Sequence, residues 1–277
     1  MKYIFKIKTA VLLALCVLFF PFGCSTKNNV RHYISAVDNL EEYDSSWFTF
    51  CKGSPMWSIK KVNNPSLDGD ALKISILKGY PYANVHFFAD LFPEPEAVDF
   101  SLSLYFMFRP KTTFNNEGAP STIQAIEFSM SKWDLSKRYE FALQWQNVGE
   151  GAPQWRYWDP HNPKPWTDLG IYQTFEPKKW YYFKMEGAIV DGKVLYREFT
   201  VDRKRHLLDI SVRPDPMFEE ADHLAVAVQL DANFECAPYD VFIDKVKFER
   251  KTGTSADTPK LPSGKKEPST KEVINFK

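Results

Sequence analysis

The sequence predicts an all-β protein in which two antiparallel sheets pack face to face in a single domain. Apolar and polar residues alternate along many short segments, which is the pattern of strands with one buried face. Hydrophobic residues make up 44% of the chain and aromatic residues 16%, enough for a large core. Between residues 32 and 250 almost no segment has a helical period, and no repeat has the spacing of a solenoid or propeller.

The clearest predicted strand covers residues 98–108. Every second residue in it is a large apolar one, and only an extended chain places that set on one face: Phe100, Leu102, Leu104, Phe106 and Phe108. The same alternation predicts strands over residues 72–76, 139–145, 180–185, 193–201 and 223–230. Asp191-Gly192 is a strong hairpin signal between the segments 180–185 and 193–201.

The first 23 residues have the layout of a secretory signal. A basic start is followed by an apolar run over residues 10–20, which is too short to span a bilayer as a stable helix. Gly23-Cys24 then resembles the lipobox of bacterial lipoproteins, although that pattern prefers Leu where Pro21 stands. The resemblance implies cleavage before Cys24 and lipidation of this residue; the alternative is an uncleaved membrane anchor.

This signal predicts a protein of the cell envelope that is attached to the lipid bilayer through its N-terminal lipid. Ser25 after the cysteine resembles the outer-membrane sorting pattern, which applies if the host is Gram-negative. Nucleic acid is not an expected partner, because Lys plus Arg equals Asp plus Glu at 35 each.

The sequence divides into four parts: a signal peptide over residues 1–23, the lipidated cysteine with a polar tether over 24–33, the sandwich over 34–250, and a tail over 251–277. The tail is rich in Lys, Ser, Thr, Pro and Gly, and it has too few apolar groups to order itself. We therefore expect it to be flexible.

Four segments, in this order, carry a resemblance to a known family: residues 38–41 with Trp47, residues 69–74, residues 180–185 and residues 241–248. With them the chain resembles the concanavalin A-like jelly rolls, which include lectins, laminin-G-like domains, carbohydrate-binding modules and some glycan-cleaving enzymes. The likeness covers most of residues 34–250, with Lys245 where the family usually has Asn. It implies a jelly-roll sandwich with an opening strand at residues 38–41; a fold alone does not give a function.

Asp244 is the residue of the closing segment with the clearest chemical consequence. Alternation predicts that four residues share one face: Phe242, Asp244, Val246 and Phe248. If that face is the core, it buries the carboxylate of Asp244. The resemblance implies a structural Ca²⁺ held by Asp244 together with Glu41 or Asp38, and oxygen ligands suit calcium. The alternative is a carboxylate satisfied by backbone N–H groups or by a Lys or Arg.

Two cysteines, Cys51 and Cys236, remain in the predicted globular part. An oxidising compartment allows a disulfide between them, and the first and last strands of jelly rolls often lie side by side. The alternative is two buried thiols. Neither cysteine is in a CxxC motif, so no zinc site is expected.

A glycan site is predicted around residues 144–166. Gln144 and Gln146 alternate with Leu143 and Trp145 and therefore belong to a polar, concave face. A proline-rich loop is expected to follow with rings on which sugars stack: Trp155, Tyr157, Trp158 and Trp166. Glu127 and Arg156 are expected to add hydrogen bonds; the alternative is that the tryptophans pack as core under the edge of the sandwich.

Known catalytic motifs are absent from the sequence. The glucanases of the resembling superfamily carry Glu-x-Asp-x-x-Glu on one strand, whereas Ser129 and Lys132 follow Glu127 here. Alginate-lyase-like jelly rolls use Gln-x-His, which residues 124–126 lack, and Tyr-Phe-Lys, which residues 182–184 match. We therefore expect a lipoprotein that binds glycan non-catalytically. The alternatives are a polysaccharide lyase or glycoside hydrolase built from residues distant in sequence, and a structural or adhesion lipoprotein that contacts another protein.

Overall fold

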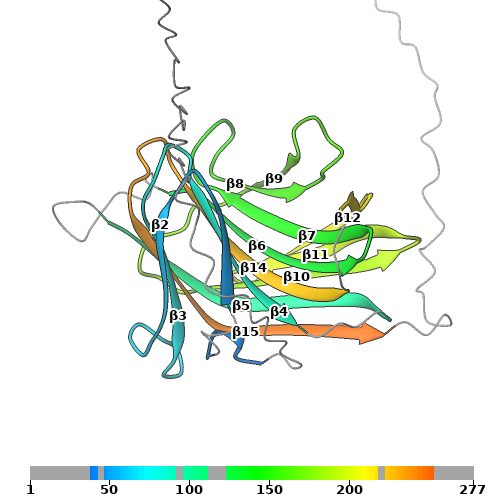
Figure 1. The fold of residues 1–277 in the computed structure, drawn as a ribbon, viewed down its shortest axis with the longest axis horizontal. Helices are drawn as coiled ribbons and strands as arrows, with labels where there is room; N and C mark the ends of the chain where they lie inside the picture. Colours follow the sequence, from blue (N-terminus) through cyan, green and yellow to red (C-terminus); the bar gives the residue numbers. More distant parts are fainter. Residues whose placement is uncertain (1–37, 43–46, 92–95, 112–122, 218–221, 253–277) are drawn as a thin grey trace, which may run out of the picture.

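The computed structural model describes residues 38–42, 47–91, 96–111, 123–217 and 222–252. Two antiparallel sheets stack as a sandwich (Figure 1), which confirms the predicted fold class. One sheet has eight strands. In spatial order they are β1 (Trp47–Lys52), β4 (Asn84–Leu91), β14 (His223–Ala232), β6 (Ile123–Asp134), β7 (Lys137–Gln146), β8 (Gln154–Trp158) and β9 (Trp166–Tyr172), with the short β13 (Asp215–Pro216) beside β7.

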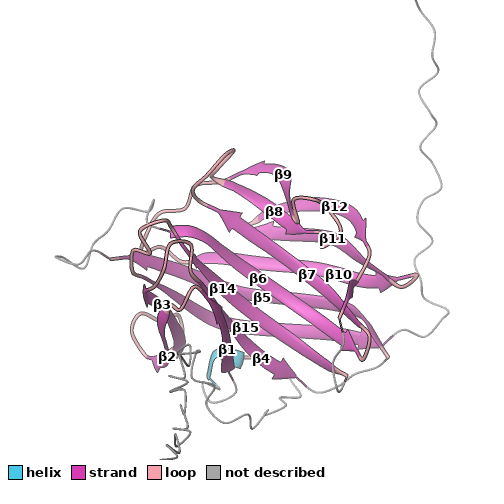
Figure 2. Cartoon of the chain, turned by 45° about the horizontal axis from the view of Figure 1, so that its top comes forward, coloured by secondary structure: helices cyan, strands magenta, loops and turns pink. Residues whose placement is uncertain are grey.

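The other sheet has seven strands. In spatial order they are β12 (Lys204–Val212), β11 (Lys193–Val201), β10 (Tyr181–Val190), β5 (Ala97–Pro110), β15 (Tyr239–Thr252), β3 (Ala71–Lys78) and β2 (Met56–Val62). Strands dominate the chain, and a single helical turn, η1 (Leu40–Glu42), accompanies them in the described residues (Figure 2).

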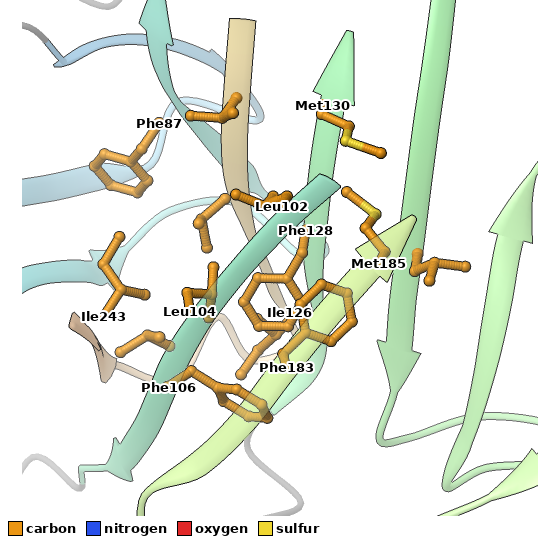
Figure 3. Packing of buried hydrophobic residues seen from close by; sticks show 14 of the residues in the cluster. Phe87, Leu102, Leu104, Phe106, Ile126, Phe128, Met130, Phe183, Met185 and Ile243 are labelled. Carbon is orange, nitrogen blue, oxygen red and sulfur yellow. The ribbon is translucent and has the colours of Figure 1, made fainter. Parts of the chain in front are cut away.

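The core lies between the two sheets and is rich in aromatic rings. Figure 3 shows Phe106, Phe128 and Phe183 meeting there from β5, β6 and β10. The ring centroids of Phe128 and Phe183 are 4.5 Å apart, and those of Phe106 and Phe128 are 5.1 Å apart. Burying each such side chain stabilises the fold by roughly 1.5–3 kcal/mol. The alternating apolar residues of segment 98–108 all belong to this core, as predicted.

The hairpin between β10 and β11 is also confirmed. Val190 pairs with Lys193, and Asp191-Gly192 forms the turn between them. Both turn residues have positive φ, 51° and 70°. These angles suit the tight turns whose twist matches that of two antiparallel strands.

Two expectations about local structure were wrong. Residues 40–42 form the single 3-10 turn η1 and not an opening strand. In β15 the pairing with β5 shifts between Asp244 and Lys247, and Lys245 has a φ of 52°. This bulge displaces the two-residue alternation by one residue.

The bulge separates residues that were expected to share a face. Val246 and Phe248 point into the core beyond it, as Val241 and Ile243 do before it. Phe242 faces outward, with the Arg109 guanidinium 5.1 Å from its ring centroid. By the same alternation Asp244 lies on the outer side of β15 and not among the core residues.

Several predictions concern segments outside the described residues. They are the signal peptide (1–23), Cys24 with its tether (24–33), and the tail beyond residue 252; β15 itself runs to Thr252. Within the described ranges no helix has the length and apolarity needed to cross a membrane.

Candidate functional site

A row of polar residues crosses the outer face of the eight-stranded sheet. Its members lie directly opposite one another on six neighbouring strands, and we call them the polar row: His86, Gln229, Glu127, Gln144, Arg156 and Asp168. Neighbouring strands are spaced by about 4.8 Å, so the row is about 24 Å long. Because the residues on either side of each member along β14, β6 and β7 belong to the core, the row faces away from it.

Hydrogen bonds join the central members of the row to Asp231. The Arg156 guanidinium donates to Oε1 of Gln144. The amide nitrogen of Gln144 donates to Oδ2 of Asp231 at 3.0 Å, and that of Gln229 donates to Oδ1 at 2.5 Å. One network therefore fixes side chains from β8, β7 and β14.

Glu127 lies at the centre of the row but outside this network. Its side chain is 4% exposed, and within the described ranges it receives no hydrogen bond and forms no ion pair. Burial raises the pKa of Glu127 well above its ordinary value, and the charges of Glu140 and Asp231 raise it further. Arg138 and Arg156 lower this pKa without offsetting the rise. The environment therefore favours the protonated acid.

Asp231 is the second carboxyl group of the site. Burial raises its pKa to about 6, while the hydrogen bond from Gln229 and the charge of Arg156 lower it. The two amide donors stabilise the charged form, so Asp231 is mostly ionised at pH 7.

Aromatic rings stand at both ends of the polar row. At the β1 edge, the ring centroids of Phe48 and Phe88 are 5.3 Å apart, those of Phe88 and His86 are 5.5 Å apart, and those of Phe50 and His86 are 5.9 Å apart. Phe48 is 41% exposed and Phe50 is 51% exposed. These rings give the row an accessible apolar end.

At the β9 edge, Trp158 and Trp166 form the other end. Their ring centroids are 5.1 Å apart, and the Arg156 guanidinium lies 5.8 Å from the ring of Trp166. Both tryptophans are partly exposed.

The structure separates the predicted glycan-binding residues into two groups. Glu127, Gln144, Arg156, Trp158 and Trp166 lie on the outer face, as expected. Gln146 lies there too, but its amide donates to the carbonyl of Val148 and so braces the loop after β7.

The prediction was wrong for two rings. Trp155 is fully buried, with its ring centroid 5.5 Å from that of Phe183, and Tyr157 packs against Tyr196 at 5.6 Å. Residues 154–158 form strand β8 and not a loop. Its two-residue alternation turns Trp155 and Tyr157 toward the core.

Other members of the site were missed in the sequence: His86, Gln229, Asp231, Asp168, Phe48 and Phe50. A signal for part of this set was available, because Gln229 and Asp231 alternate with Val228 and Leu230 just as Gln144 does with its neighbours. What the sequence lacks is the order of the strands, which places β14 beside β6.

The Tyr-Phe-Lys match to alginate lyases lies away from the polar row. Lys184 is on β10, in the other sheet, where it lines a pocket of about 630 Å³ and pairs with Glu186. Four more charged residues of this pocket also pair locally: Lys247 with Glu249 at 2.8 Å, and Arg197 with Asp99 at 2.7 Å. The match therefore contributes nothing to the row.

Of the three predicted calcium ligands, Asp244 and Glu41 lie near each other, whereas Asp38 lies apart from them. Oδ2 of Asp244 accepts hydrogen bonds from the Ser66 hydroxyl at 3.0 Å and from the Leu67 N–H at 2.6 Å. Its Oδ1 is buried and has no hydrogen-bond partner in the described part of the chain. The Glu41 carboxylate accepts hydrogen bonds from the backbone N–H groups of Lys245 and Val246.

Glu41 and Asp244 are close enough to interact. Burial raises the pKa of Glu41 to about 7, and the charge of Asp244 adds to the rise although backbone hydrogen bonds oppose it. Asp38 does not join them, since its side chain is 75% exposed and lies 3.6 Å from the Lys247 ammonium. Among the described residues no three His, Cys, Asp or Glu side chains are grouped to hold a metal. A calcium ion here would therefore need main-chain carbonyls or water as further ligands.

The predicted disulfide between Cys51 and Cys236 is not formed. Cys236 is a free, buried thiol. The turn at Gly79 packs closely against its sulfur. A Cβ atom built onto Gly79 would lie only 3.2 Å from Cys236 Sγ. Its role is therefore the packing of a small apolar group.

Comparison with known proteins gives structural likeness at low identity. No family model and no curated protein matches the chain. A structure of carbohydrate-binding modules from the β-sandwich superfamily is 9% identical, with a TM-score of 0.39, over 78% of this chain and 62% of that chain. An endo-β-1,4-glucuronan lyase from the fungus Trichoderma reesei is 14% identical, with a TM-score of 0.46, over 80% and 95%. A PL-14 alginate lyase from Aplysia kurodai is 12% identical, with a TM-score of 0.48, over 73% and 90%. These are kinds of protein that the sequence resemblance named, and the likeness concerns the fold alone.

Proposed function

We propose that this protein binds glycan chains on the outer face of its eight-stranded sheet. One observation carries the proposal: a polar row about 24 Å long ends in accessible aromatic rings on both sides. Sugars present hydroxyl groups at their edges and C–H groups on their faces. Guanidinium and carboxyl groups match the hydroxyls, and aromatic rings match the C–H faces, while the buried amides of Gln144 and Gln229 hold Asp231 in place.

The same row disfavours a protein-contact surface. The buried centre of a protein interface is depleted of charged residues. Here the centre of the face holds Glu127, Arg156 and Asp231. The length of the row also favours an extended oligosaccharide over a single sugar as the ligand.

A glycan array probed with the purified full chain tests the proposal. Binding to at least one polysaccharide, with affinity lost when the row is altered, is the expected result. If no polysaccharide binds at millimolar sugar concentration, glycan binding on this face is excluded.

Removing the terminal rings is expected to weaken that binding. Phe50→Ala and Trp166→Ala should each cost about 1 kcal/mol of binding energy, or roughly fivefold in Kd, because each removes one stacking ring. Isothermal titration with the best glycan of the array measures the change. Leu207→Ala serves as the control, since Leu207 is exposed on β12 of the opposite sheet; equal effects of all three substitutions would contradict the assignment.

We further propose that the chain is a lipoprotein anchored through Cys24. The support is the sequence signal that ends at this residue. Cys24→Ala is expected to abolish incorporation of a labelled fatty acid and to shift the protein out of the membrane fraction. A variant that remains in the membrane fraction without the label would favour the uncleaved anchor instead.

We also propose a structural Ca²⁺ at Glu41 and Asp244. The support is the buried, unpartnered Oδ1 of Asp244 beside a second buried carboxyl group. Oxygen ligands of this kind suit calcium, whose charge would stabilise both ionised groups.

A further inference from the structure

The polar row contains two carboxyl groups on neighbouring strands. Glu127 of β6 lies opposite Gln229 of β14, and Asp231 follows two residues along β14. Such a diagonal pair has Cα atoms about 7–8 Å apart, with both side chains on the same face. From Cα positions at this spacing, side chains of the length of Asp and Glu can place their carboxyl groups on opposite sides of one bond, with a water between them.

Their surroundings give the two groups opposite preferences. Asp231 accepts hydrogen bonds from the amides of Gln144 and Gln229, which stabilise its charge. Glu127 is almost fully buried and receives no donor within the described ranges, which stabilises its neutral form. A protonated acid beside an ionised carboxylate is the arrangement that acid–base catalysis requires.

We infer that Glu127 is the general acid and Asp231 the general base of glycosidic-bond hydrolysis on this face. The inference rests on the proposed glycan binding. In this step Glu127 gives its proton to the bridging oxygen as the bond from that oxygen to the anomeric carbon breaks. Asp231 takes a proton from the water whose oxygen forms the new bond to the same carbon. Afterwards solvent returns a proton to Glu127 and removes one from Asp231.

The sequence motif of glucanases does not bear on this pair. That motif takes its carboxylates from a single strand, and Ser129 and Lys132 interrupt it here. Asp231 instead arrives from β14, which is remote from β6 in sequence and adjacent to it in the sheet. The pair is therefore visible only once the strand order is known.

The pH dependence of turnover should have two limbs. Turnover should fall as the pH drops through about 6, where Asp231 gains a proton, and fall again at high pH as Glu127 loses one. The charged groups that act on the pair are Glu140 and Arg138 on β7 and Arg156 on β8. His86 on β4 is neutral across this range, because burial and the charges of Lys52 and Arg138 lower its pKa to about 4.

The test uses the full chain and each polysaccharide that it binds. New reducing ends and ultraviolet absorbance are recorded together at saturating glycan, so that weaker binding does not mimic slower chemistry. Glu127→Gln and Asp231→Asn should each lower turnover by at least about a hundredfold. Glu235→Gln, an exposed carboxylate between β14 and β15, is the control and should retain wild-type turnover.

The outcomes separate this inference from the proposed binding. Glycan that is bound but left intact by the wild-type protein overturns hydrolysis and leaves binding standing; absence of any binding overturns both. Products that absorb in the ultraviolet would show elimination and overturn the hydrolytic step. Since the proton that buried Glu127 must retain costs stability above pH 4.5, Glu127→Gln should melt no lower than the wild type, and full turnover in this folded variant would overturn its role.

Discussion

Replacing Trp155 by alanine is expected to destabilise the protein by about 3–5 kcal/mol. The ring is fully buried between the sheets, 5.5 Å from that of Phe183 and 5.3 Å from that of Phe199. Its indole N–H donates to Oε1 of Gln173 at 3.2 Å. Truncation would leave a cavity and an unpaired acceptor, because the strands around the ring are fixed by their own ladders.

Chemical denaturation measures this loss, and Trp166→Ala is the matched control. Trp166 is partly exposed at the outer face, so its truncation should cost much less stability while weakening glycan binding. The two tryptophans thus report separately on the core and the site. A Trp155→Ala protein that unfolds at the wild-type denaturant concentration would contradict the packing of β8 described here.

Alternation predicted the sandwich because burial on one face of a sheet forces a period of two. It worked best for β5, whose five alternating apolar residues all reach the core. It would have worked for β8 too, had the surrounding prolines not suggested a loop. Pro153 precedes this strand and Pro160, Pro163 and Pro165 follow it, whereas residues 154–158 contain none. The proline content of the whole segment 153–165 therefore suggested a loop, although the short strand β8 within it contains no proline.

The alternation failed where one extra residue enters a strand. At the bulge in β15, Lys245 has a positive φ, which a lysine in the sequence does not predict. Asp244 is consequently held by Ser66 and Leu67, residues of a distant loop. The prediction of a buried carboxylate was confirmed, but the side of the strand on which it lies was wrong.

Half of the candidate site was beyond the reach of sequence reasoning for a topological reason. The polar row takes its members from strands as far apart in the chain as β4 and β14, which are neighbours in the sheet. Local patterns identify which residues face outward on each strand, whereas long-range pairing decides which of them meet. Glu127 was therefore recognised alone, and its relation to Asp231 was not.

Without calcium, the stability of the protein is expected to fall by about 3 kcal/mol as the pH rises from 4.5 to above 7, through Glu41 alone. Burial raises the pKa of Glu41 from an ordinary value of 4.5 to about 7. The folded state therefore holds a proton in this interval that the unfolded state has already released. Stability then declines with rising pH, at about 1.4 kcal/mol for each unit of the difference in pKa.

Denaturation curves at pH 5 and pH 8 in a chelator, for the wild type and for Glu41→Gln, isolate this effect. Other carboxyl groups with raised pKa values, Glu127 and Asp231 among them, act in the same direction in both proteins. Only the difference between the two proteins therefore belongs to Glu41. If both lose the same stability between the two pH values, the raised pKa of Glu41 is refuted.

Adding Ca²⁺ is expected to reverse the loss at pH 8 and to do little at pH 5, because the ion binds the ionised carboxylates that high pH creates. Glu41→Gln should respond weakly at both pH values, since one of the two charged ligands is gone. Loss of the Glu41 proton destabilises the folded protein, and a bound metal ion would thus take the place of this proton. A melting temperature that Ca²⁺ leaves unchanged at pH 8 would mean that Glu41 and Asp244 are held by hydrogen bonds alone.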